Sequence, residues 1–195
     1  DYRENAKKLY NCRGIMAPIS QSTHGMVWPS PWIIWTAGAG WLSRFFYDYW
    51  LYTRDEEFLE QRVIPFLKEV ALFYEDFLIE DEEGKLMFVP SLSPENRPSI
   101  SNPSLGTVNA TMDVSIAKEV LNNLINACKH LDKEKDNINK WEEMLEKLPQ
   151  YQINEDGAIK EWIHENLPDN YHHRHQSHIY PLFPGLEVTR EENPE

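Results

Sequence analysis

The sequence predicts an all-α fold assembled from antiparallel helical hairpins. Two observations predict it: four segments carry apolar residues at helical spacing, and these segments occur in pairs joined by only a few residues. No low-complexity segment or linker divides the 195 residues, which favours one domain. Because the sequence opens at DYRENAKKLY without a Met and stops at EENPE without a closing element, we expect residues 1–195 to be a single, incomplete domain fragment.

The first helical pair is expected over residues 32–51 and 56–78. The stretch 32–51 is apolar on nearly every side and contains several small residues, which predicts a buried helix that another backbone approaches closely. Thr53 and Asp55 then offer capping side chains to the second, amphipathic segment. Pro65 interrupts that segment, so we expect it to kink the helix or to begin a new first turn.

The second helical pair follows a short extended region. Residues 81–90, DEEGKLMFVP, combine a glycine turn with an alternating end, which predicts a hairpin or an extended lead into the next loop. Apolar stripes then predict helices at 111–131 and 134–148. Asp113 lies at the start of the first of these, where N-capping is its simplest explanation. Beyond residue 150 the periodicity is too weak for a long helix.

Composition narrows the classes of function. The net charge of −13, from 32 acidic and 19 basic residues, argues against a general nucleic-acid binder, which needs clustered Lys and Arg. Aromatic residues make up 12% of the chain, and their flat faces supply core but also stack on sugar rings. Cys12 and Cys128 match no metal or redox spacing, so we expect buried free thiols. No apolar run is long enough to predict a membrane span.

A histidine-rich cluster near the end suggests metal binding, but its surroundings favour another explanation. His172, His173, His175 and His178 lie close together with Arg174. Cysteine is absent nearby, acidic neighbours are few, and no His-Glu-x-x-His pattern occurs. Hydrogen bonding to a polar ligand, or a structural network, is therefore favoured over a metal site.

Carboxylate chemistry remains after other mechanisms are considered. The chain has no Gly-x-Ser-x-Gly elbow and no glycine loop suited to phosphate. Carboxylates in loop-like context are Glu95, Asp113, Glu155, Asp156, Glu161 and Asp169.

Glu95 is the most unusual of these, because it lies in SLSPENR (91–97) between a proline and an asparagine. Glycoside hydrolysis with inversion needs a carboxylic acid and a base about 6.5–9.5 Å apart. A glutamate in a proline-rich loop suits the acid, and an ordinary solvated loop residue is the open alternative.

Several motifs together resemble glycoside hydrolase family 95. They are CRGI (12–15), TAGAGWLSRFFYDYWLYTRDEEFL (36–59), PSLSPEN (90–96), ATMDVSI (110–116) and HRHQSHIYPLFPG (173–185), in family order. The family consists mainly of alpha-L-fucosidases acting on 1,2-linked fucose, with some alpha-L-galactosidases. The resemblance implies a partial (α/α)6 toroid, an inverting and metal-independent reaction without a cofactor, and a glycan substrate. It also suggests an extracellular or periplasmic location.

The resemblance assigns residues as well. Glu95 corresponds to the family's general acid, while His173, Arg174, His175 and His178 belong to the segment that lines its sugar pocket. The family activates water with an Asn-x-Asn pair upstream and an Asp downstream, and neither is found upstream of Glu95 or beyond the histidine-rich segment. We therefore expect the fragment alone to be inactive.

Other candidate substrate contacts carry simpler alternatives. Where relatives have a His-Thr-Asp-like sequence this chain has MAPISQSTHGM, so His24 is a candidate in its place. Trp28, beside a proline, is a candidate sugar platform, whereas core packing is favoured for Trp41. The remaining candidates are Asn96 and Arg97, with turn capping as the alternative, and Glu161.

The sequence leaves three hypotheses about function open. The first is the fucosidase-like hydrolase, the second another helical-toroid glycosidase or a sugar phosphorylase, and the third a non-catalytic carbohydrate-binding helical scaffold. The oligomeric state is not indicated.

Overall fold

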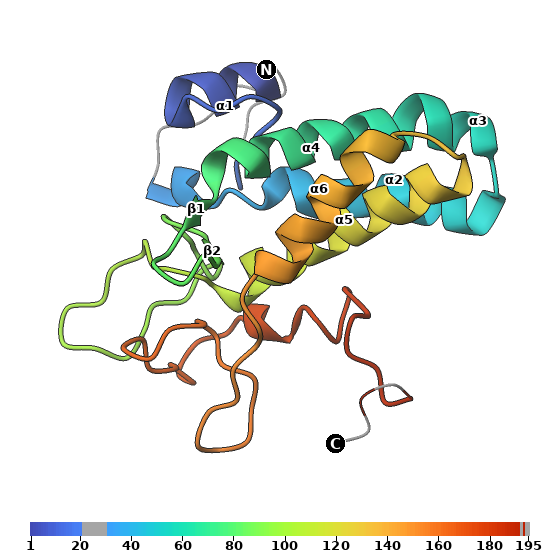
Figure 1. Ribbon diagram of the computed structural model, residues 1–195. Helices are drawn as coiled ribbons and strands as arrows, with labels where there is room; N and C mark the ends of the chain where they lie inside the picture. Colours follow the sequence, from blue (N-terminus) through green and yellow to red (C-terminus); the bar gives the residue numbers. More distant parts are fainter. Residues whose placement is uncertain (21–30, 192, 194–195) are drawn as a thin grey trace.

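In the computed structural model, which describes residues 1–20, 31–191 and 193, helices form one half of the molecule and long loops form the other (Figure 1). The predicted all-α class is confirmed. In the described part of the chain, the one sheet is a hairpin of β1 (Ile79–Glu80) and β2 (Leu86–Met87), which pair antiparallel. The sequence predicted a hairpin at 81–90, and the structure places its second strand inside that region and its first strand just before it.

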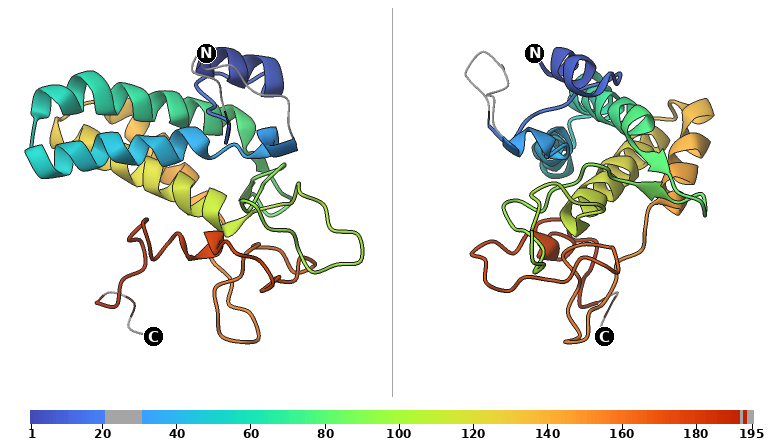
Figure 2. Two further views of the ribbon diagram at one scale, coloured as in Figure 1. Left: turned by 180° about the vertical axis from the view of Figure 1, so that it is seen from behind. Right: turned by 90° about the vertical axis from the view of Figure 1, so that its left-hand side faces the viewer.

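The first helical pair is α2 (Gly38–Thr53) and a return segment that ends in α4 (Ile64–Phe77). The two run side by side in opposite directions (Figure 2). α2 ends where Arg54 adopts a left-handed φ of 57°, and the Asp55 side chain then accepts a hydrogen bond from Phe58 N at 2.9 Å.

The return segment is not one regular helix. It begins with α3 (Glu56–Phe58), continues as a π-helical turn (Leu59–Val63), and becomes α4 with Pro65 in its first turn. Proline fits there because the first turn needs no N–H from it. The predicted interruption at Pro65 is therefore confirmed as a new first turn.

The second helical pair, α5 (Thr111–His130) and α6 (Lys135–Lys147), matches its predicted positions closely. α5 is the central helix of the bundle and packs against α2, α4 and α6. A Cβ added at Gly40 of α2 would lie 2.6 Å from Ile116 Cγ2 and 2.7 Å from Tyr74 Oη. The close helix approach predicted from the small residues is confirmed at this glycine.

A further helix, α1 (Tyr2–Tyr10), lies on the side of the bundle away from the loop half (Figure 1). It begins with a capping box between Asp1 and Glu4. A 3-10 turn follows the undescribed segment at Pro31–Ile34. Cys12 and Cys128 are buried free thiols, as predicted. No helix of the described residues is long and apolar enough to cross a membrane.

One expectation about α2 is wrong. The sequence predicted burial on nearly every side, yet one face is open: Trp41 is 38% exposed, Phe45 58% and Tyr52 90%. Trp41, for which core packing was favoured, is thus only partly buried. The physical reason is that α4, α5 and the π-helical turn pack against α2 and leave these three aromatic side chains outside the packed face.

The loop half gathers at the start of α5, in the lower part of Figure 1. Two isolated bridges fasten it there, between Ser91 and Thr107 and between Ala110 and Trp162. Beyond residue 150, the residues that the structure describes contain a short 3-10 turn, Ser177–Ile179, and no long helix, as predicted. Residues far apart in sequence, from the SLSPENR loop and from 160–178, consequently meet at one end of the bundle.

Candidate functional site

Glu95 lies at the surface where the SLSPENR loop meets the histidine-rich segment. Its Oε2 forms an ion pair with Nη2 of Arg174. The Glu95 side chain is 30% exposed and that of Arg174 68% exposed, so both remain accessible from solvent. The structure therefore brings together two candidates that are 79 residues apart in the sequence.

The backbone on both sides of Glu95 is held by other residues. The carbonyl oxygen of Pro94 accepts a hydrogen bond from Ser177 Oγ and lies 3.3 Å from His175 Nδ1. On the other side, Asn96 is 1% exposed and donates from Nδ2 to the carbonyl of Asn170 at 2.9 Å. Glu95 is thus a partly exposed side chain on a firmly anchored loop.

Glu161 lies beneath this loop and is 2% exposed. Its Oε1 accepts a hydrogen bond from Ser93 Oγ at 2.7 Å, and its Oε2 accepts one from Asn96 Nδ2 at 2.5 Å. We call these three residues the Glu161 clamp. Burial raises the pKa of Glu161 to about 7 and outweighs the two hydrogen bonds, which favour the charged form; the Asp169 carboxylate adds to the increase.

Asp113 is a second buried carboxylate under the same loop. Its Oδ2 accepts hydrogen bonds from Ser91 Oγ at 2.6 Å and from Leu92 N at 3.1 Å. The prediction that it caps α5 is wrong, because the N-cap residue is Ala110 and Asp113 lies inside the first turn with its side chain on the loop. Complete burial raises its pKa to about 7, against the effect of its hydrogen bonds.

The histidines support the loop from the side of the C-terminal segment. His178 Nδ1 lies 3.9 Å from Glu161 Oε2, and burial lowers the pKa of His178. His173 Nδ1 accepts a hydrogen bond from the backbone N–H of His175 at 3.1 Å, and the two rings meet edge to face. Among the described residues, no three His, Cys, Asp or Glu side chains group as a metal ion would need.

The remaining candidates have different positions. Arg97 is exposed, and its backbone joins the loop to the C-terminal segment because its carbonyl accepts from Asn170 Nδ2 at 3.1 Å. His24 and Trp28 lie outside the described residues. The sequence did not single out Ser93 and Ser177. The one signal available for Ser93 was the alternation of Ser91 and Ser93 in SLSPENR, which places both hydroxyls on the same side of an extended segment.

Two of the hollows on the described surface allow the loop end of the bundle to be compared with its helical side. A hollow of about 460 Å³ adjoins the anchored loop. It is lined by Trp41, Met112, His175, Gln176, Ser177, Tyr180, Phe183 and Pro184. Aromatic rings beside polar groups suit a sugar, whose ring faces are apolar and whose hydroxyls need partners.

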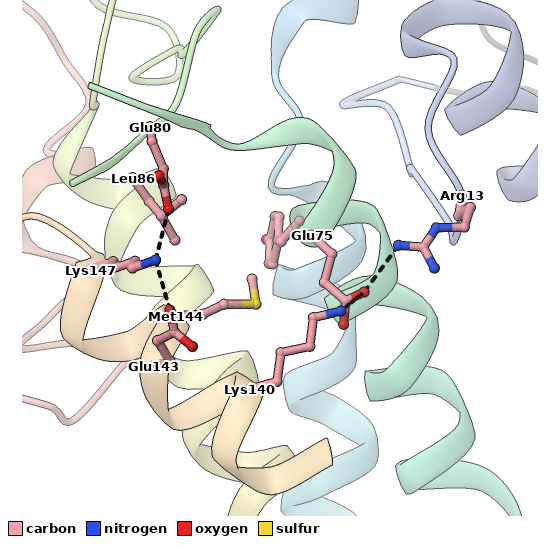
Figure 3. A pocket seen from close by; sticks show the side chains of 9 residues that line it. Arg13, Glu75, Glu80, Leu86, Lys140, Glu143, Met144 and Lys147 are labelled. Carbon is pink, nitrogen blue, oxygen red and sulfur yellow. Dashed lines mark hydrogen bonds and ion pairs between the residues drawn. The ribbon is translucent and has the colours of Figure 1, made fainter. Parts of the chain in front are cut away.

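The other hollow, of about 260 Å³, lies between α4, α6 and the β1–β2 hairpin (Figure 3). Its charged side chains pair with one another: Glu75 contacts Lys140 at 2.6 Å and Arg13 at 3.1 Å, and Lys147 lies 2.8 Å from both Glu80 and Glu143. None of the predicted site residues that the structure describes lines it. The loop end of the bundle is therefore the better candidate site.

Comparison with solved structures identifies the class of fold to which the paired helices belong. The chain superimposes on "Putative kojibiose phosphorylase from human microbiome" with a TM-score of 0.64 and 15% identity, over 82% of this chain and 25% of the other. At this identity the likeness concerns the fold alone. The paired helices form part of a helical toroid, with the candidate site in the loops at one end.

Comparison with protein families is more specific. The model of the glycosyl hydrolase family 95 catalytic domain matches residues 1–195. The chain belongs to this family, as the motifs predicted.

Two curated relatives agree with that assignment. "Alpha-L-fucosidase 2" of Arabidopsis thaliana is 37% identical over 167 residues, covering 84% of this chain. "Probable alpha-fucosidase A" of Aspergillus niger is 27% identical over 162 residues, covering 81%. In both cases the match covers 20% of the relative, so the chain spans about a fifth of the length of these proteins.

Proposed function

We propose that this chain is the acid-bearing part of a larger glycoside hydrolase that removes terminal alpha-L-fucosyl or alpha-L-galactosyl groups with inversion. The observation that carries the proposal is the contrast between three carboxylates at one loop. Glu161 and Asp113 are buried and engaged by hydrogen bonds, whereas Glu95 is partly exposed. The family membership and the alpha-L-fucosidase relative support the reaction class and the sugar.

In the proposed reaction Glu95 donates a proton to the glycosidic oxygen as the bond to the departing sugar breaks. A guanidinium group only donates hydrogen bonds, and Arg174 binds Oε2 of Glu95, so the donated proton is carried on the other oxygen, Oε1. Arg174 and His175 are then placed to bind sugar hydroxyls. The base that activates water would lie about 6.5–9.5 Å from Glu95 and come from residues outside this chain.

Replacing Glu95 by Gln in the complete protein tests this role. We expect the variant to lose about 100-fold or more in kcat on an alpha-1,2-fucosylated oligosaccharide, since general acid catalysis contributes about 10²–10⁴-fold. Activity on alpha-L-fucosyl fluoride should fall much less, because fluoride leaves without a proton donor. Retention of most activity on the oligosaccharide would exclude Glu95 as the acid.

The fold likeness to a protein named as a phosphorylase supports one alternative, a phosphorylase that uses phosphate in place of water. Product analysis with and without inorganic phosphate separates the two: a hydrolase releases free sugar in both, and a phosphorylase releases sugar phosphate only when phosphate is present. A non-catalytic carbohydrate-binding scaffold would bind the oligosaccharide and release neither product.

A further inference from the structure

We propose that Glu161 is a positioning residue for Glu95, because its buried carboxylate fixes the loop from which the proposed acid projects. The inference rests on the proposed function and adds a residue to it. Ser93 and Asn96, which Glu161 binds, lie two residues before and one residue after Glu95. A single side chain thus fastens the loop on both sides of the acid.

The Glu161 clamp requires a hydrogen-bond acceptor at the position of Glu161 Oε2. The Asn96 amide is fixed in orientation, since its Oδ1 accepts from Arg97 N at 2.8 Å and its Nδ2 donates to Asn170 O at 2.9 Å. Turning the amide over would break both bonds, so Nδ2 must face Glu161. The Ser93 hydroxyl is free to rotate and can donate or accept.

This difference separates two substitutions. A glutamine at position 161 can direct its carbonyl to Asn96 and its NH₂ group to Ser93 Oγ, which preserves both contacts. An alanine leaves the buried Ser93 and Asn96 donors without their acceptor. Glu161→Gln is therefore the conservative variant and Glu161→Ala the disruptive one.

Glu161 is itself rooted in the helical half of the molecule. Its backbone carbonyl accepts from Thr111 N at 3.0 Å, at the start of α5, and its N–H donates to Asp169 Oδ1 at 2.8 Å. The next residue, Trp162, is completely buried and bridges Ala110. Glu161 thereby links the loop that carries Glu95 to the start of the central helix, α5.

A direct contact between Glu161 and a sugar fits these observations less well. The side chain is 3% exposed, and each of its oxygens already has a protein donor. The ionisable groups that face it are His178, with Nδ1 at 3.9 Å from Oε2, and Asp169, bonded to its backbone. In the described part of the chain, no lysine or arginine forms an ion pair with it. Its contacts are those of a support beneath the site.

The test measures kcat and KM in the complete protein on two substrates, an alpha-1,2-fucosylated oligosaccharide and alpha-L-fucosyl fluoride. The oligosaccharide needs the proton donor and the fluoride does not. We expect Glu161→Ala to lower kcat about 100-fold on the oligosaccharide and less than about 5-fold on the fluoride, with KM changed less than about 3-fold. Glu161→Gln should stay within about 5-fold on both substrates.

Ser93→Ala provides a milder variant in case Glu161→Ala does not fold. It removes one hydrogen bond of the clamp and leaves the carboxylate and Asn96 in place, so we expect a loss of about 5- to 10-fold on the oligosaccharide alone. Equal losses on both substrates for this variant would indicate a merely structural role and overturn the proposal, as would full activity of Glu161→Ala.

Glu95→Gln, assayed beside these variants, separates the assignment of Glu95 as the acid from the assignment of Glu161 as its positioning residue. If Glu95→Gln keeps its activity on the oligosaccharide, the acid assignment fails and the positioning role fails with it. If Glu95→Gln loses that activity while Glu161→Ala keeps it, the acid assignment stands and only the role of Glu161 is overturned.

Discussion

Arg174 and Glu95 form an ion pair between Nη2 and Oε2 that joins the histidine-rich segment to the SLSPENR loop. Because both side chains are solvent-accessible, the pair contributes little to folding; exposed pairs typically contribute less than about 1 kcal/mol. The same pair sets the direction of the Glu95 side chain, and it leaves the other carboxyl oxygen, Oε1, for the proton that the proposed reaction needs. The pair is thus better explained by the site than by stability.

The first prediction follows from this contrast. Arg174→Gln in the complete protein should lower kcat/KM on the oligosaccharide about 10-fold or more, because a charged partner of acid and sugar is lost. The melting temperature should change by less than about 3 °C. Enzyme assays and a thermal melt on the same preparation provide both values.

Lys135→Gln is the matched control for Arg174→Gln. Lys135 forms an exposed ion pair with Asp132 at 2.7 Å, away from the loops, so neither activity nor melting temperature should change. A melting temperature lowered by many degrees in Arg174→Gln alone would contradict the assignment of this arginine to the site.

The second prediction concerns the dependence of stability on pH. Burial raises the pKa of both Asp113 and Glu161 to about 7, from usual values near 4. Stabilisation from a carboxyl whose pKa is raised in the folded state is fully present below its unfolded pKa and is lost as the pH rises through the folded value. The contribution of these two groups to the free energy of unfolding should therefore fall between about pH 5 and pH 7.5, by roughly 2 to 3 kcal/mol for each group.

Denaturant unfolding of the chain at several pH values checks the second prediction. The range should stay above about pH 5, because the hydrogen bonds from Arg13 and Lys68 lower the pKa of Asp76 and Glu134, whose contributions are lost in more acidic solution. Asp113→Asn and Glu161→Gln should each flatten the slope. A slope that neither substitution changes would show that these carboxyls do not titrate in this range.

The sequence predicts well those features of the fold that depend on neighbouring residues in the chain. It predicts poorly those that depend on contacts between distant segments. The second helical pair was predicted almost to the residue, because periodicity along one segment reports which face is buried. Gly40 was informative for the same reason, since a small residue in an apolar helix marks a close approach. The open face of α2 was not predictable, because apolar side chains show what can be buried and not what covers them.

The same distinction between local patterns and distant contacts applies to the candidate site. Motifs predicted Glu95 and Arg174 as site residues, and the structure shows that the two are in contact. The prediction that Asp113 caps the helix was wrong, because its partners Ser91 and Leu92 precede it by 22 and 21 residues in a loop. A carboxylate in a first helical turn has the same local sequence whether it caps the helix or holds a loop. Glu161 was a candidate contact, and only the tertiary structure reveals Ser93 and Asn96 as its partners.

The third prediction concerns Ser177, whose hydroxyl donates to the carbonyl of Pro94, the residue before Glu95. Ser177→Ala removes this bond and leaves His175 Nδ1, at 3.3 Å, as the remaining partner of that carbonyl. The loop should stay folded but hold the acid less firmly, so we expect kcat on the oligosaccharide to fall about 10-fold with KM nearly unchanged. Ser101→Ala, in an exposed part of the neighbouring loop, is the control and should have full activity. If Ser177→Ala raised KM and left kcat intact, Ser177 would bind substrate rather than hold the loop, and the two anchors of Glu95 would reduce to the Glu161 clamp alone.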